Sequence, residues 1–82
     1  MSDNIRGWTL WPEMADKIRK GARYQYVRQE VTCTMSRDDC GCRTEIVSKT
    51  RGAHELRFGC EQEMLYHAME LLAPLSDWAV QP

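Results

Sequence analysis

The four cysteines are the side chains of this sequence with the clearest capacity for chemistry. Cys33, Cys40, Cys42 and Cys60 belong to a chain of 82 residues. Thiolates bind zinc tetrahedrally or act as nucleophiles, depending on where the fold places them. The spacing holds a Cys-x-Cys pair rather than the two Cys-x-x-Cys pairs typical of zinc fingers. The chemistry of the cysteines therefore depends on where the strands that carry them place their side chains.

Residues 24–60 alternate between apolar and polar positions, which predicts β-strands. In the first strand, 24–35, the alternation places Cys33 and Met35 on the core side and Tyr24, Tyr26 and Arg28 on the outer side. Turn-forming residues at 36–41 and 51–52 separate this strand from two more, over 42–50 and 53–60. We therefore expect a three-stranded antiparallel meander.

The hairpin geometry of this meander brings three cysteines together. A turn centred on residues 37–38 places Cys33 opposite Cys42 or Arg43, and a turn at 51–52 places Cys60 opposite about the same two positions. All three side chains then lie on the core side of the sheet. Convergence of this kind suggests a single site.

Several interpretations of the cysteines stay open. One is a structural zinc site formed by Cys33, Cys40, Cys42 and Cys60, which would supply the staple that a small domain can use. Another is that the thiols are free and fill the core, because free cysteine is among the most buried residue types. A cross-strand disulfide is excluded if the protein stays in a reducing compartment. The cofactor expectation is accordingly none or one structural zinc.

A helix on each side of the meander completes the expected fold. Pro12 suits a first helical position and Gly21 a helix end, so residues 12–20 form a short helix. Residues 61–72 predict a second helix that covers the sheet, and Pro74 ends it. The apolar side chains at helical spacing on this helix are Met64, Leu65, Ala68, Leu71 and Leu72. We predict an α+β fold of order α-β-β-β-α, with the C-terminal helix packed on the sheet, as a single domain over residues 1–82.

The predicted element order resembles that of double-stranded-RNA-binding domains over most of the chain. The last helix of that family opens with a basic cluster, whereas this helix opens with Glu61, Gln62 and Glu63. The departure removes the phosphate contacts, so the resemblance is confined to the order of elements.

Charge and length limit the classes of function. The chain has 11 Lys and Arg against 12 Asp and Glu, a net charge of -1, which disfavours a dedicated nucleic-acid binder. Residues 59–82 hold acidic residues and no basic ones. No apolar run approaches the roughly 20 residues of a membrane span, and the first residues lack the pattern of a secretory signal. We expect a cytoplasmic protein with no membrane contact.

Two binding surfaces are predicted. Tryptophan is enriched at interface hot spots and acidic side chains steer basic partners, which makes Trp8, Trp11, Glu63 and Glu70 candidates for protein contact. Aromatic and basic side chains on an outer sheet face can stack and contact single-stranded nucleic acid. The side chains for this second surface are Tyr24, Tyr26, Arg28, Arg43 and Arg57.

The sequence contains no phosphate-binding glycine loop, zinc-protease motif or triad pattern, so no enzyme is predicted. The leading hypothesis is a small non-enzymatic regulator or inhibitor, of the size encoded by phages and other mobile elements, that docks on a larger bacterial protein assembly. The alternative is a zinc-stabilised nucleic-acid-binding module.

Overall fold

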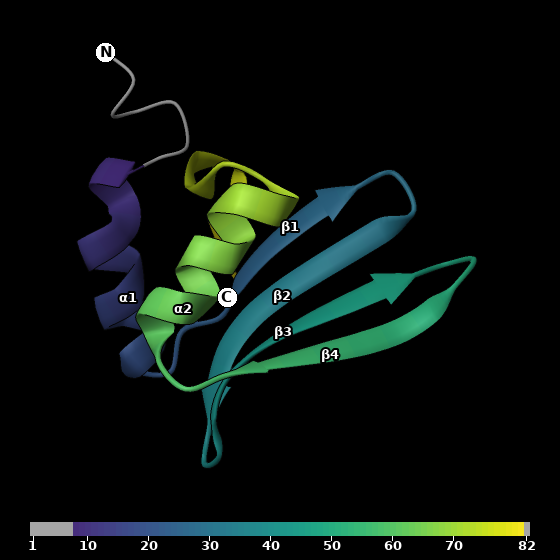
Figure 1. Ribbon diagram of the computed structural model, residues 1–82. Helices are drawn as coiled ribbons and strands as arrows, with labels where there is room; N and C mark the ends of the chain where they lie inside the picture. Colours follow the sequence, from purple (N-terminus) through teal and green to yellow (C-terminus); the bar gives the residue numbers. More distant parts are fainter. Residues whose placement is uncertain (1–7, 82) are drawn as a thin grey trace.

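A five-stranded antiparallel sheet with two helices against one face forms the protein (Figure 1). The computed structural model describes residues 8–81, with side chains from residue 9 onward. The strands stand side by side in the order β4-β3-β2-β1-β5. Their bounds are β1 Tyr24–Arg28, β2 Val31–Asp38, β3 Gly41–Ser48, β4 Gly52–Phe58 and β5 Ala79–Val80. The α+β class, the antiparallel sheet and the two helices are confirmed. The three-stranded meander is wrong, because the sheet has five strands.

The first predicted strand is in fact two strands joined by a turn at residues 29–30. Gln29 has a φ of 49°, in the left-handed region that tight hairpin turns use. Tyr24 lies opposite Met35, so even-numbered residues of β1 share a face with odd-numbered residues of β2. Tyr24, Tyr26 and Arg28 therefore lie on the same face of the sheet as Cys33. Their predicted outward placement is wrong.

The first helix matches its prediction to within one residue. It is preceded by a 3₁₀ turn, η2 (Trp8–Leu10), and α1 spans Trp11–Arg19 with Pro12 in its first turn. Gly21, with a φ of 106°, lets the chain turn toward β1. Met14, Ala15 and Ile18 form the buried stripe that faces the sheet.

The second helix covers the predicted span but changes its winding. α2 runs from Glu61 to His67 and continues as a π-helical turn, η3, over Ala68–Leu72. A 3₁₀ turn, η4 (Leu75–Asp77), follows Pro74 and leads into β5. α1 and α2 contact each other on one face of the sheet (Figure 1). None of the helices within residues 8–81 is both long and apolar enough to cross a membrane.

The helices leave part of the sheet uncovered. The core lies between the two helices and the central strands, with Ile18, Met35, Met64 and Leu65 fully enclosed. The turns at 29–30 and 49–51 extend beyond the helices (Figure 1). The backbone N–H of Lys49 donates to the carbonyl of Glu30 at 3.0 Å, which joins these two turns. One end of the sheet is therefore packed and the other end is open.

Candidate functional site

The cysteines do not meet as the hairpin arithmetic predicts. Cys33 lies opposite Ile46, and Cys42 lies opposite Arg37, so the pairing of Cys33 with Cys42 is wrong. The turn sits at residues 39–40, two positions later than expected, and this shifts each pairing by four. The backbone N–H of Cys40 donates to Oδ1 of Asp38 at 2.9 Å, which favours the turn at this position.

The four thiols differ in their surroundings. Cys33 and Cys42 are buried, Cys40 is exposed and Cys60 is partly buried, and all four are free. Burial raises the pKa of the Cys33 thiol. Burial and then the neighbouring Glu61 carboxylate raise the pKa of the Cys42 thiol, with a smaller contribution from Cys60. Within residues 8–81, no group of three or more His, Cys, Asp or Glu side chains is placed to hold a metal ion.

The predicted aromatic and basic surface is divided between the two faces of the sheet. Tyr24 is buried on the helix-covered face, whereas Arg43 and Arg57 lie on the opposite face. Nη1 of Arg43 lies 3.2 Å from Glu55, and Nη1 of Arg57 lies 2.9 Å from Asp38. The predicted single surface for stacking and contacting nucleic acid is therefore wrong.

The other predicted contact residues are scattered. The side chain of Trp8 lies outside the described residues, and Trp11 is half-buried against the core. Glu63 and Glu70 are exposed on the helix and its π turn. Oε1 of Glu63 accepts a hydrogen bond from the backbone N–H of Gly59 at 3.1 Å, which gives Glu63 a role in fixing the helix start.

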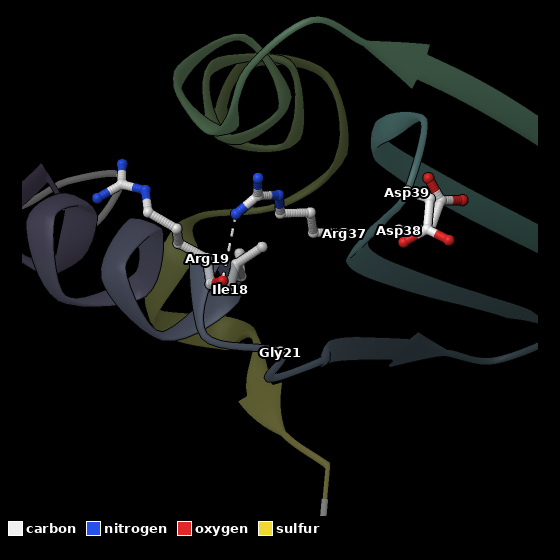
Figure 2. Close-up of a pocket in the computed structure, with 6 residues that line it drawn as sticks. All are labelled: Ile18, Arg19, Gly21, Arg37, Asp38 and Asp39. Atoms are coloured by element: carbon white, nitrogen blue, oxygen red, sulfur yellow. Dashed lines mark hydrogen bonds between the residues drawn. The ribbon is translucent and has the colours of Figure 1, made fainter.

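One hollow, of about 350 Å³, lies where α1 meets the β2–β3 turn (Figure 2). Its lining comprises Ile18, Arg19, Gly21, Arg37, Asp38 and Asp39. Figure 2 shows Arg37 reaching toward α1, where its Nη1 donates to the carbonyl of Arg19 at 3.3 Å. Two acidic side chains in the same lining offset the two guanidinium groups, so the hollow carries no charge preference for a ligand.

The carboxylate of Glu61 forms ion pairs with the guanidinium groups of Arg19 and Arg37 beside this hollow. It lies 3.4 Å from Nη2 of Arg19 and 3.8 Å from Nε of Arg37. A hydrogen bond from its own backbone N–H lowers the pKa of Glu61, and Arg19 and Arg37 lower it further. The three side chains join α1, α2 and β2, which is a structural role.

A second hollow, a groove of about 220 Å³, has the character of a binding site. It lies between the π-helical turn and the first hairpin and is lined by Tyr26, Arg28, Val31, Cys33, Leu71 and Leu72. We call it the Leu71 groove. Leu71 has 72% of its surface exposed, the largest exposed fraction among the large hydrophobic side chains of residues 9–81. Apolar lining with few polar groups is typical of sites that take an apolar ligand or segment.

Two of the groove residues, Tyr26 and Arg28, are among the predicted contact residues. Regular helical spacing predicts that Leu71 and Leu72 face the core. The π turn adds a residue to the periodicity, so Met69 is buried and Leu71 faces outward. The sequence gives no signal for a π turn, and the groove was missed for that reason.

The rim of the Leu71 groove is basic. Arg28 is an exposed lining residue, and Lys49 and Arg51 are exposed in the adjacent turn, which is joined to the first hairpin by the hydrogen bond to Glu30. Three basic groups stand against two carboxylates, Glu30 in the first hairpin turn and Glu70 beside Leu71, which leaves a net charge of one positive unit around the groove. A ligand with negative charge beside its apolar part would complement it.

Comparisons of the chain with protein-family models, curated proteins and solved structures give no match.

Proposed function

We propose that the protein is a small non-enzymatic binding protein, acting as a regulator or inhibitor, that docks on a larger protein through the Leu71 groove. The observation that carries the proposal is the exposure of Leu71 at 72% beside an apolar hollow. A single exposed leucine is ordinary on a protein surface, but one continuous with an apolar groove marks a contact site. A short apolar segment of the partner would bury both.

The basic rim specifies the chemistry of that segment. Arg28, Lys49 and Arg51 would lie beside the bound segment and favour acidic residues in it. Complementary charge at a rim increases the association rate and orients the partner more than it adds affinity. The segment is therefore expected to combine two or three apolar side chains with flanking Asp or Glu.

Selection of peptides from a random display library on the full chain tests the proposal. We expect enrichment of peptides with apolar residues and flanking acidic residues. Leu71→Lys should weaken a selected synthetic peptide at least about tenfold, because losing one well-buried leucine contact is worth roughly 1.5–3 kcal/mol. Val27→Lys is the matched control, since Val27 is 60% exposed on the opposite face of the sheet.

The rim has its own test in the salt dependence of the same peptide. Arg28→Glu should slow association at low salt, and the difference from the wild-type protein should shrink as salt is added. Peptides that bind equally well to the Leu71→Lys variant would overturn the assignment to this groove. Tight, salt-dependent binding of labelled single-stranded RNA with no selected peptide would favour the nucleic-acid alternative instead.

A further inference from the structure

The outer edge of β4 is open. β4 pairs with β3 on one side, and on its other side no strand lies within residues 8–81. Every residue from Gly52 to Arg57 is exposed, and α2 packs against the end of β4 through the contact of His67 with Phe58. The opposite edge of the sheet is β5, which has only two residues. A seven-residue open edge presents a row of backbone groups that can pair with another strand.

We propose that β4 pairs antiparallel with β4 of a second copy of the chain, about a two-fold axis at Leu56, to make one sheet of both copies. With Leu56 on the axis, Glu55 faces Arg57 of the second copy and Arg57 faces its Glu55. On the helix-covered face of the sheet, His54 of each copy lies opposite Phe58 of the other copy. Residues that oppose one another in an antiparallel pair share a face, so both helical layers lie on one side of the joined sheet.

The charge pattern of β4 selects this register and this partner. An axis at Glu55 would set two carboxylates face to face, and an axis at Arg57 would set two guanidinium groups face to face, both unfavourable. Only the axis at Leu56 pairs each charge with its opposite in both copies. Glu55 and Arg57 already lie 2.6 Å apart within one chain, so the second copy extends an existing ion-pair network across the edge. An isologous interface of this kind is the commonest way to form a dimer.

Sedimentation velocity of the full chain over a range of concentrations tests the proposal. We expect a monomer–dimer equilibrium. Leu56→Lys places two ammonium groups on the axis and should raise the dimer dissociation constant at least about tenfold. Leu56 is 39% exposed and Val27 is 60% exposed, so Val27→Lys on the other face is a control that should leave the dimer intact.

Exchanging the charges of Glu55 and Arg57 tests the proposed register separately from a general effect of added charge at the edge of the sheet. Glu55→Arg alone sets two arginines opposite each other and should weaken the dimer. The double variant, Glu55→Arg with Arg57→Glu, reverses both charges, restores the pairing and should recover the dimer. Circular dichroism of each variant reports that the fold is kept.

Two outcomes would overturn the proposal. One is a chain that stays monomeric throughout, and the other is a dimer that neither Leu56→Lys nor Glu55→Arg affects. The proposal is independent of the Leu71 groove, because Leu71→Lys should remove peptide binding and leave dimerisation unchanged. Failure of one proposal is therefore distinguishable from failure of the other.

Discussion

The rings of Tyr26 and Trp78 lie 5.7 Å apart between centroids, at an interplanar angle of 38°. Trp78 is buried, and its Nε1–H donates to the carbonyl of Ala73 at 3.4 Å. Tyr26 lines the Leu71 groove, so Trp78 supports that wall from the C-terminal segment. Through this contact, the segment that precedes β5 holds one wall of the Leu71 groove in place.

Replacement of Trp78 by alanine should therefore destabilise the whole domain. Removing a buried aromatic ring and leaving a cavity costs about 3–5 kcal/mol, a large fraction of the stability of a chain this small. Trp78→Phe keeps a ring beside Tyr26 and should cost less. Urea unfolding followed by circular dichroism measures both, and a loss below about 1 kcal/mol for the alanine variant would contradict the role assigned to Trp78.

Glu61 predicts a specific dependence of stability on pH. Its pKa is lowered in the folded state, so its stabilisation is present above the ordinary pKa of 4.5 and is lost as the pH falls through the lower folded pKa. Glu61→Gln should reduce the unfolding free energy at neutral pH by about 1 kcal/mol and flatten the decline on the acid side. Unfolding curves collected across this range, with the exposed Glu63→Gln variant as control, check the effect. An equally steep acid decline in Glu61→Gln would contradict it.

Thr44 gives a prediction of the opposite sign. It is fully buried, and its Oγ1 has no hydrogen-bond partner among residues 8–81. A buried hydroxyl without a partner costs free energy, so Thr44→Val should stabilise the protein by about 1 kcal/mol or more. Thr34→Val is the control, because Thr34 is partly buried on the face of the sheet opposite the helices. Thermal unfolding measures both variants, and we expect the stability to change less for Thr34→Val. Destabilisation by Thr44→Val would mean that the hydroxyl makes a favourable interaction.

The thiols should react in two classes. Cys40 is exposed and Cys60 is partly exposed, whereas burial raises the pKa of Cys33 and Cys42 and reduces their thiolate content. Titration with a thiol reagent should modify Cys40 first, Cys60 next and the other two only after denaturation. Metal analysis of the same sample tests the zinc hypothesis. One zinc per chain, with all four thiols protected until chelation, would contradict the expected order of reaction.

Local signals in the sequence predict the elements better than their pairing. Pro12 and Gly21 locate α1, and the apolar spacing after Glu61 locates α2, because each signal acts within a few residues. The turn at residues 29–30 carries neither glycine nor proline, and Gln29 adopts a positive φ there. Missing this turn merged two strands and reversed the face assigned to Tyr24 and Tyr26. One short turn thus decides which side of the sheet holds the aromatic side chains.

The proposed site was predicted only in part, for a related reason. Residue type alone makes Tyr26 and Arg28 candidates for contact, and both line the Leu71 groove. Regular α-helical spacing places Leu71 beside Ala68 and so predicts that it faces the core. The π turn depends on packing against the sheet and on the chain leaving toward Pro74, and no residue type marks it. The exposed leucine that carries the functional proposal is a product of tertiary packing.

The exposure of β4 on both faces has a consequence for how the domain opens. Because only Phe58 of β4 packs against the core and the other residues of the strand are exposed, β4 is held chiefly by backbone pairing with β3, and its local opening free energy should lie below that of global unfolding. When β4 detaches, β3 becomes the sheet edge and the buried row around Thr44 and Cys42 is uncovered. The tendency of the protein to aggregate should then depend on how often β4 separates from β3.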